Sequence, residues 1–495
     1  MTLRIGTRKQ LFVDDTIVER LSDVTQTFHQ AHKCPQNPVV WGDRPWELYG
    51  NWIYGTVVYD EKLSQYRMWY QTNSGLPKGV LLRDYVQGDD GATWRRVNSG
   101  STYGSMVCYA TSSDGIHWEK PDLDIIEWNG STKNNIVWAT GYLDAYDASI
   151  IIDEDNPDPE LRYKMYYWDI RDSDRAQGMW LAISPDGLHW KPYQDMPLIQ
   201  EIGDVLPTVY DEQKDRYLSF TKIEVVRPGD DRYWRSVGMS QSPDGLSWST
   251  PRLIIESDEQ DVAMAQAAGG ERTEFYGLAG FPYEGMYLGL LWVFRIDRFN
   301  PPGTTRGWDD GPIDVQLAYS HDGEQWMRTK DRSPVIPVNP PGNFDGGSLY
   351  TVNRPIVTDD QILIYYCGSA LTHGNDHPPN YNAIGLATLR RDGFASLGAG
   401  PWEGEVLTKP FILEGNSLEL NIDAHRGYAR VELTTPDGEP LEGFSYAECD
   451  LITNDEVRCR VTWNGSADVS RIQGAPVRLR VGLRHAQWYA FQIIA

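Results

Sequence analysis

A short pattern recurs along this 495-residue chain and restricts its fold more than any other feature. An Asp-Gly pair is followed, three residues after the glycine, by tryptophan. Complete copies begin at Asp114, Asp186, Asp244 and Asp322, and a further copy at Asp392 has lost the tryptophan. Successive copies lie roughly 60 to 80 residues apart, which is long enough for a four-stranded sheet and longer than the shortest propeller repeats. The chain is therefore built largely from repeated β-units.

The residues around each copy predict the same order of strands. Asp-Gly forms a tight turn because glycine tolerates a positive φ. A short apolar strand precedes the turn, as in Val107 to Ala110, and an aromatic strand lies upstream of it, as in Tyr66 to Tyr70. A strand further upstream ends in an acidic turn, as at Asp60, and no strong amphipathic helix interrupts the series. Five such units predict an all-β fold, a five-bladed β-propeller.

The rhythm changes after Leu397. A short linker, Gly398 to Pro401, precedes strands in which every second residue is apolar, such as Val477 to Leu483. This alternation is typical of a half-buried antiparallel sandwich. We therefore expect an N-terminal strand or extension over residues 1–45, the propeller over 46–397 and a C-terminal β-sandwich over 398–495. The apolar strand Gln10 to Val13 either packs on the sandwich or closes the ring.

Charge and hydropathy exclude several classes of partner. Seventy acids against forty-five bases give a formal net charge of −25, which repels nucleic acid and anionic membranes. No stretch reaches the ~18–20 apolar residues of a membrane helix, and charged residues stand where a secretory signal would be apolar. We expect a soluble, cytoplasmic protein whose partner is a carbohydrate, and its oligomeric state stays open. The five scattered cysteines form no C-x-x-C pair, so free thiols are expected.

Acidic residues stand near the start of the innermost strand of every predicted unit. Innermost strands of a propeller converge on one funnel, so these carboxyls would share a cavity and shift one another's pKa. Such shifts let one site hold a general acid and a general base, the pair that glycoside hydrolysis requires. An acid at a strand start can equally be a solvated turn residue. The catalytic candidates are Glu47, Asp147, Asp204, Glu274 and Asp345.

Aromatic residues that flank these strand starts, together with an arginine and three histidines, are candidates for substrate binding. Aromatic rings could offer flat faces to a sugar, although ordinary packing explains them as well. The histidines could bond a sugar or lie in surface loops, and the arginine could pair with an acid or a substrate anion. The candidates are Trp46, Trp52, Tyr146, Tyr276, Arg354, His373, His377 and His32. No metal-ligand set is predicted and no cofactor is required, but a ring of carboxylates suits a calcium ion in the funnel.

Five repeats with inward acids resemble the five-bladed glycosidases, namely glycoside hydrolase families 32 and 43. The segments Leu11 to Asp15 (Leu-Phe-Val-Asp-Asp) and Trp488 to Gln492 (Trp-Tyr-Ala-Phe-Gln) look like a poorly characterised bacterial group of family 32-like hydrolases. The resemblance covers nearly the whole chain in architecture and implies a carbohydrate-cleaving enzyme.

The resemblance ends at the catalytic motifs. Family 32 enzymes carry Trp-Met-Asn-Asp-Pro-Asn-Gly, Arg-Asp-Pro and Glu-Cys in their first three blades. Here Glu448-Cys449 lies in the sandwich and Arg171-Asp172 follows the wrong strand, so fructan cleavage is not implied. Likeness of fold is a weak warrant for an activity.

The sequence therefore predicts a glycoside hydrolase, exo-acting on a small glycoside or oligosaccharide. Asp204 and Glu274 are the leading acid candidates, and Glu47 and Asp147 the leading base candidates. Two alternatives stay open: a glycoside phosphorylase on the same fold, which needs Arg, Lys or His beside the acids to hold phosphate, and a non-catalytic carbohydrate-binding propeller.

Overall fold

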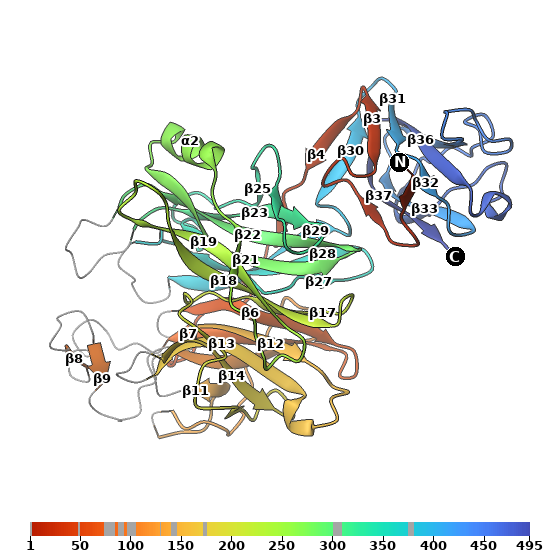
Figure 1. The fold of residues 1–495 in the computed structure, drawn as a ribbon. Helices are drawn as coiled ribbons and strands as arrows, with labels where there is room; N and C mark the ends of the chain where they lie inside the picture. Colours follow the sequence, from red (N-terminus) through yellow and green to blue (C-terminus); the bar gives the residue numbers. More distant parts are fainter. Residues whose placement is uncertain are drawn as a thin grey trace.

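The computed structural model of the chain describes residues 2–47, 50–73, 85–87, 94–96, 105–128, 130–139, 146–171, 176–299, 309–374 and 381–495. It is almost entirely β-structure, arranged as a larger and a smaller group of sheets, with both chain ends in the smaller group (Figure 1). Within these residues the α-helix is α2 (Glu259–Ala267), accompanied by the 3-10 turns η1 (Pro159–Leu161) and η2 (Ser470–Ile472). No helix in the described ranges has both the length and the apolar character needed to span a bilayer.

The larger group contains successive antiparallel runs of strands, which we call units one to five. Unit one contains β6 (Asn51–Asp60), β7 (Gln65–Asn73), β10 (Ser105–Ser112) and β11 (Ile136–Ala139). Unit two contains β12 (Tyr146–Ile152), β13 (Tyr163–Arg171) and β14 (Ala176–Ser184), with β15 (Lys191–Pro192) and β16 (Ile199–Gln200) on its outer edge. Unit three contains β17 (Thr208–Asp211), β18 (Arg216–Val226), β19 (Tyr233–Ser242) and β20 (Arg252–Ile255).

Units four and five share one ten-stranded sheet, because Ile313 pairs in parallel with Ser348. Unit four contains β21 (Arg272–Tyr283), β22 (Met286–Ile296) and β23 (Ile313–Ser320), with β24 (Met327–Arg328) and β25 (Pro334–Ile336) outside. Unit five contains β26 (Ser348–Thr351), β27 (Ile356–Val357), β28 (Gln361–Ser369) and β29 (Asn382–Arg390). A separate hairpin joins β8 (Tyr85–Gln87) and β9 (Trp94–Arg96).

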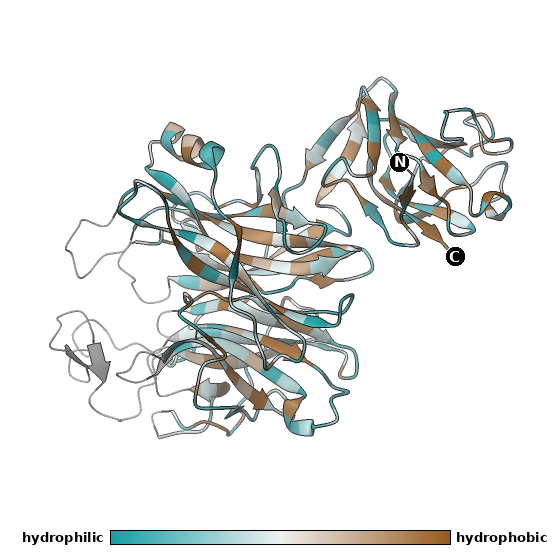
Figure 2. Ribbon diagram, viewed as in Figure 1, coloured by the Kyte–Doolittle hydropathy of each residue, from teal (hydrophilic) through white to brown (hydrophobic). Residues whose placement is uncertain are grey.

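The first strands of the units lie against one another in chain order. β6 contacts β12, β12 contacts β17, β17 contacts β21, and β26 returns to β6. The rings of Tyr276 on β21 and Tyr350 on β26 complete the series with centroids 5.4 Å apart. Apolar residues run along these strands while polar residues gather at the turns (Figure 2). The first strands of the units are thereby packed together.

The four Asp-Gly turns that keep the tryptophan have the same internal hydrogen bonds. In unit two, Gly187 N donates to Ser184 Oγ at 2.9 Å, and Leu188 N donates to Asp186 Oδ1 at 2.8 Å. Trp190 Nε1 then donates to the Gly187 carbonyl at 3.0 Å. The same tryptophan bond forms in units one, three and four at 3.2, 3.0 and 3.0 Å. The predicted turn is confirmed, and its tryptophan serves to cap the glycine carbonyl.

An aromatic residue of the neighbouring unit also reaches this turn. Tyr365 Oη of unit five donates to Gly115 O at 2.8 Å, and Trp69 Nε1 of unit one donates to Gly187 O at 2.7 Å. Tyr166 Oη of unit two donates to Gly245 O at 2.9 Å. These bonds join unit one to unit two and unit two to unit three, and the one from Tyr365 joins unit five to unit one.

The N-terminal residues belong to both groups of sheets. β5 (His32–Lys33) pairs with β29 and completes unit five. The preceding strands pair with strands that lie from Ala395 onward. One six-stranded sheet contains β1 (Leu3–Arg4), β3 (Val18–Ser22), β31 (Gly404–Thr408), β32 (Phe411–Ile412), β34 (Tyr428–Thr434) and β36 (Pro476–Arg484). The other contains β2 (Gln10–Leu11), β4 (Thr25–Phe28), β30 (Ala395–Ala399), β33 (Ser417–Asp423), β35 (Asp455–Arg460) and β37 (Ala486–Ile494).

These two sheets share one core, in which Phe12 packs edge-on against Trp488 with ring centroids 4.6 Å apart. The Leu11 to Asp15 and Trp488 to Gln492 segments therefore meet in one structure, since Gln10 and Leu11 pair with Phe491 and Ala490. All five cysteines are free thiols, as the sequence predicts, and Cys34 alone among them is not fully buried.

The turn geometry predicts a difference between two glycine substitutions. Gly245 and Gly229 both have positive φ, +74° and +84°, so alanine costs each about 1–2 kcal/mol of backbone strain. A Cβ at Gly245 would lie 2.4 Å from Tyr166 Oη, whereas one at Gly229 would have no neighbour within 4 Å. We expect Gly245→Ala to lower the free energy of unfolding by a further ~1–3 kcal/mol. Denaturant unfolding of both variants measures this, and equal losses would contradict the proposed tight contact between units.

Candidate active site

The structure separates the predicted acids into two kinds. Asp147, Asp204 and Glu274 lie in one cluster of interacting charges, while Glu47 and Asp345 are each enclosed with a lysine elsewhere. Asp204 alone among the five keeps an exposed side chain, with 34% of its surface accessible, whereas the other four residues are fully buried. Asp204 is therefore the predicted acid that a solute can reach.

Glu47 forms an enclosed ion pair at the edge of unit one. Its Oε2 lies 2.7 Å from Lys120 Nζ, and Tyr70 Oη donates to its Oε1 at 2.6 Å. The backbone N–H groups of Asp43 and Arg44 also donate to Oε2. This carboxylate is fully occupied in holding the chain that enters β6.

Asp345 repeats this arrangement in unit five. Its Oδ2 lies 2.6 Å from Lys33 Nζ and accepts from Tyr366 Oη at 3.0 Å, while Asn339 Nδ2 donates to Oδ1 at 2.9 Å. The lysine comes from β5, the strand that the N-terminal region contributes. The bonds of Asp345 therefore secure the edge of unit five.

Asp204 stands just before β17 and is paired with Lys222 of β18. Lys222 Nζ contacts Asp204 Oδ1, and the same ammonium lies 4.2 Å from the centre of the Tyr276 ring. Partial burial alone would raise the pKa of Asp204, but the charge and hydrogen bond of Lys222 outweigh it and lower that pKa. Asp204 is therefore held as a carboxylate.

Asp147 supports the chain that carries Asp204. Its Oδ2 accepts from Leu206 N at 2.5 Å, and Ser149 Oγ accepts from Thr208 N at 3.0 Å. Burial raises the pKa of Asp147 well above its usual range, and the negative charge of Asp204 adds to the effect. Asp147 thus favours its neutral form and anchors the chain two residues beyond Asp204.

Glu274 is clamped between two arginines. Its Oε2 lies 2.6 Å from Arg235 Nη1, and its Oε1 accepts from Arg272 Nε at 2.8 Å. Arg235 also donates to Asp309 Oδ2 at 3.2 Å. Burial would lower the pKa of Arg235, but Glu274 and Asp309 raise it, so the guanidinium stays charged. Glu274 fixes Arg235, whose side chain remains 19% exposed.

Aromatic rings surround the exposed carboxylate. Tyr54 lies 4.9 Å from Tyr350 and 5.2 Å from Trp292, measured between ring centroids, and Tyr276 packs 5.4 Å from Tyr350. These residues come from units one, four and five, so the rings meet where the first strands converge. Tyr276 is thus the predicted aromatic candidate that lies beside Asp204.

His373 orients the hydroxyl of Tyr276. His373 Nδ1 lies 2.9 Å from the backbone carbonyl of Asp309, which can only accept, so Nδ1 carries the proton. Nε2 is then an acceptor, 3.4 Å from Tyr276 Oη. Loss of hydration lowers the pKa of His373 to about 4, and the charges of Arg235 and Lys222 act in the same direction. The ring is neutral at neutral pH.

The remaining binding candidates contact other residues. Trp46 donates from Nε1 to Asn135 at 3.0 Å, Trp52 packs on Tyr381 and Tyr146 packs on Trp168. His32 is exposed on β5 beside a cavity of about 280 Å³ between unit five and the smaller group. His377 falls outside the described residues.

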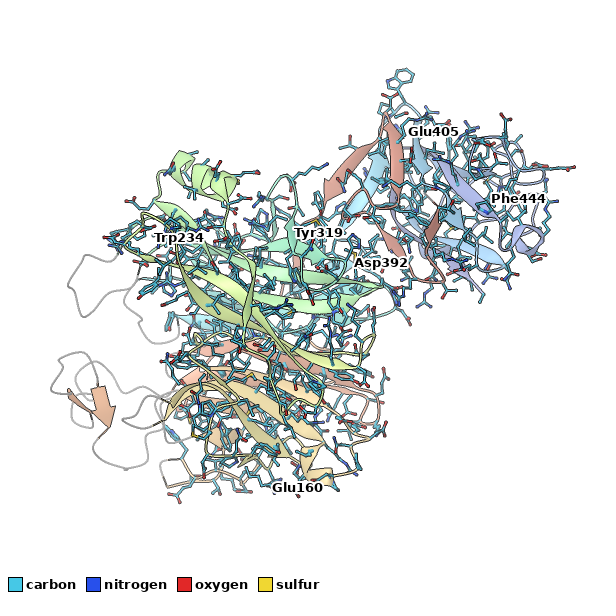
Figure 3. The ribbon with its side chains drawn as sticks, viewed as in Figure 1. Glu160, Trp234, Tyr319, Asp392, Glu405 and Phe444 are labelled. Carbon is cyan, nitrogen blue, oxygen red and sulfur yellow. The ribbon has the colours of Figure 1, made fainter. Side chains whose placement is uncertain are left out.

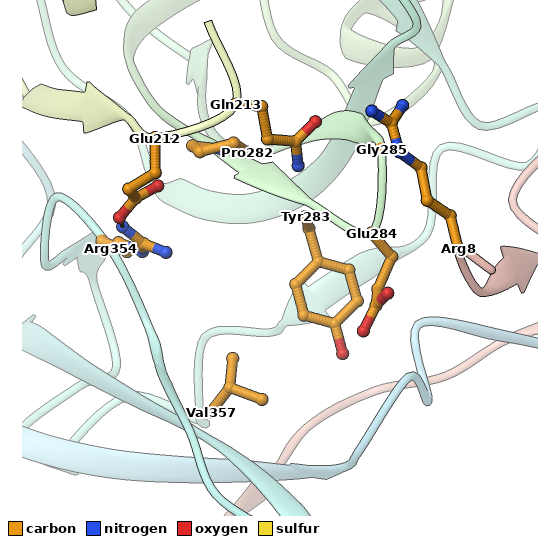
Figure 4. Close-up of a pocket in the computed structure, with 9 residues that line it drawn as sticks. All are labelled: Arg8, Glu212, Gln213, Pro282, Tyr283, Glu284, Gly285, Arg354 and Val357. Atoms are coloured by element: carbon orange, nitrogen blue, oxygen red, sulfur yellow. Dashed lines mark hydrogen bonds and ion pairs between the residues drawn. The ribbon is translucent and has the colours of Figure 1, made fainter. Parts of the chain in front are cut away.

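Arg354 lies at the opposite end of the first strands, where it pairs with Glu212 at 2.5 Å. Both line a cavity of about 460 Å³ together with Arg8, Tyr283 and Glu284 (Figure 4). Arg354 therefore does not reach the Asp204 cluster.

Sequence reasoning missed Lys222, Arg235 and Asp309. The first two lie within strands, where a charge between apolar residues usually faces solvent. The sequence signal for a buried charge was the position of Lys222, which follows the apolar stretch of β18. In the structure Lys222 lies opposite Val237 on β19 and is 9% exposed.

A group that could hold a metal ion lies in the smaller set of sheets. Asp423, His425 and Asp455 offer ligand atoms within 4.8 Å of one another. Arg390 already donates to Asp455 at 2.5 Å, and His425 bonds Asp423. In the Asp204 cluster, by contrast, the positions beside the carboxylates are occupied by Lys222 and Arg235.

No protein-family model matches the sequence, and no curated protein matches it. Solved structures with a similar fold include a β-1,2-mannobiose phosphorylase from Listeria innocua, with 11% identity, a TM-score of 0.44, and coverage of 72% of this chain and 96% of that chain. Another is an N-acetylgalactosamine deacetylase from F. plautii in complex with blood group B trisaccharide, with 15% identity, a TM-score of 0.41, and coverage of 79% and 96%. A thermostable family-43 glycoside hydrolase has 15% identity, a TM-score of 0.40, and coverage of 72% and 91%. With TM-scores below 0.5, these likenesses leave the chemistry to be argued from this chain's own residues.

The Asp204–Lys222 pair predicts a pH-dependent contribution to stability. Because the pKa of Asp204 is lowered, the contribution is present above its ordinary value of 3.8 and is lost as pH falls through the folded-state pKa. Because the pKa of Lys222 is raised, it is lost again as pH rises past 10.5. Between these pH limits, Lys222→Met should lower the free energy of unfolding by on the order of 1–2 kcal/mol. This amount is intermediate between the contributions of exposed and buried ion pairs.

Unfolding free energies of the wild-type and variant proteins at pH 3, 7 and 11 measure this effect. Lys222→Arg, which keeps the charge, is the matched control. A loss from Lys222→Met that stayed constant across pH would show that packing, not the ion pair, carries the contribution.

Proposed function

We propose that this chain is a carbohydrate-active enzyme that cleaves a glycosidic bond at Asp204, in the funnel of a five-bladed β-propeller. The propeller would carry a β-sandwich built from the two chain ends. The observation that carries the proposal is the Asp204 carboxylate, partly exposed, held ionised by Lys222 and flanked by the Tyr276 ring.

The contacts between units support the proposed propeller. Aromatic donors pass from unit one to the turn of unit two and from unit two to the turn of unit three, and Tyr365 links unit five back to Gly115 of unit one. First strands that contact one another in chain order are expected of blades around an axis. Two sheets with a common core are likewise expected of a sandwich.

The protonation states support a base or nucleophile role for Asp204. A carboxylate of lowered pKa can attack an anomeric carbon or activate a water at neutral pH. Asp309 is the candidate for the second carboxyl group, since 15% of its side chain is accessible and it shares Arg235 with Glu274. Asp147 and Glu274 are positioning residues in this scheme, because both are enclosed and hold Leu206 and Arg235.

A glycoside phosphorylase is the second candidate, and one specific observation favours it. Lys222 and Arg235 are positively charged groups near Asp204 that influence each other, and the neutral His373 ring lies close to them. Guanidinium and ammonium groups are the usual partners of phosphate oxygens. The Arg354 and His377 predicted for that role are, respectively, at the other end of the strands and outside the described residues. A calcium ion in the funnel stays a prediction.

Asp204→Asn should lower kcat by about 10²–10⁴-fold on any glycoside that the wild-type chain cleaves, because the amide cannot act as a base or nucleophile. Product release from a panel of aryl glycosides and oligosaccharides, with and without phosphate, measures it. Release only with phosphate would identify the phosphorylase.

Glu212→Gln is the matched control, since Glu212 is also paired to a cation but lies at the opposite end of β17. Full activity of the Asp204→Asn protein would refute the assignment of Asp204. Saccharide binding without release of any product would identify a non-catalytic binding propeller.

A further inference from the structure

One face of the β18–β19 hairpin leads outward from Asp204. The register pairs Lys222 with Val237, Glu224 with Arg235, and Val226 with Tyr233. Residues directly opposite in an antiparallel pair share a face, and so do residues two apart along a strand. Lys222, Arg235, Glu224 and Tyr233 therefore project from the same face of this hairpin.

Accessibility increases along that face with distance from the cluster. Lys222 is 9% exposed and Arg235 is intermediate, whereas Glu224 is exposed and Tyr233 is 61% exposed. Tyr233 lies four positions before Val237, a distance of about 13 Å along β19. This length exceeds one pyranose ring, so a sugar bound at Asp204 would leave room for at least one more residue before Tyr233.

The end of the hairpin is held firmly. Arg272, which bonds Glu274, also donates to Tyr233 O at 2.5 Å and to Asp230 Oδ2 at 3.0 Å. Trp234 Nε1 donates to the same Asp230 oxygen at 2.6 Å, and Arg227 lies 3.8 Å from the Trp234 ring centre. Trp234 stands on the side of the larger sheet group away from the chain ends (Figure 3). An aromatic ring on an anchored backbone loses little freedom when a ligand stacks on it.

We propose that this face is a second saccharide subsite, with the Tyr233 ring as a stacking platform and the Glu224 carboxylate as an acceptor for sugar hydroxyls. The inference rests on the proposed function, because the occupant is a further residue of the glycan whose bond lies at Asp204. Continuity of the face with Lys222 and Arg235 favours that occupant over a separate ligand. The preferred substrate is therefore an oligosaccharide rather than a monosaccharide glycoside.

The test measures binding as a function of chain length in the Asp204→Asn protein, in which turnover is suppressed. Isothermal titration uses gluco-, manno-, xylo-, arabino- and fructo-saccharides of one to four residues. We expect affinity to increase with length, and Tyr233→Ala to remove about tenfold of that gain while leaving monosaccharide binding unchanged. Tyr233→Phe should keep the gain, and Tyr193→Ala, at a 38% exposed tyrosine of unit two, is the matched surface control.

The outcomes separate the subsite from the proposed function. A length-dependent gain that persists in Tyr233→Ala overturns the subsite, as does the absence of binding by every saccharide of the panel. A gain that depends on Tyr233 in a protein whose wild-type form cleaves none of these sugars supports the subsite and overturns the proposed cleavage.

Discussion

The carbonyl oxygen of the turn glycine is the point on which the larger sheet group depends. It accepts one hydrogen bond from the tryptophan of its own turn and, in units one to three, a second from an aromatic residue of the preceding unit. Both lone pairs of a buried carbonyl are then satisfied without water. In unit four the second donor is replaced by packing of Phe220 against Trp326, with centroids 5.6 Å apart. Units one to three are thereby each fixed relative to the preceding unit by a directional contact, not only by apolar packing.

That arrangement packs the first strands against one another, and an acid lies near the start of each of them. Each enclosed carboxylate consequently needs a cation or several donors, since an uncompensated buried charge is too costly. Lys120 and Lys33 serve Glu47 and Asp345, and arginines serve Glu274. Asp204 differs because its cation leaves part of the carboxylate accessible. A solute can reach the Asp204 carboxylate, so the incomplete burial of this side chain is what allows it to react.

The repeat could be predicted from the sequence because every interaction in it is local, from the Ser184 hydroxyl to the Trp190 indole. An acid near the start of each first strand could also be read from the sequence, but the environment of each acid could not. Lys33 is 312 residues from Asp345 and reaches it only because the N-terminal β5 completes unit five. The cation that pairs with an acid decides whether that acid is structural or reactive. For Asp345 this cation comes from a strand that is distant in the sequence. Sequence spacing alone could not distinguish Asp345 from Asp204.

The degenerate fifth turn shows what replaces the tryptophan when a turn meets another group of sheets. Asp392 is buried where the two groups join (Figure 3). It accepts from Lys9 Nζ at 2.9 Å, Tyr283 Oη at 2.6 Å and Asn421 Nδ2 at 3.1 Å. Lys9 precedes β2 and Asn421 lies on β33, so strands from both chain ends bond the same carboxylate. A tryptophan that capped the fifth turn would occupy the space that these strands fill. The junction between the two groups of sheets therefore explains why this copy alone has lost its tryptophan. The same aspartate that closes a local turn elsewhere thus attaches the smaller group to the ring of units.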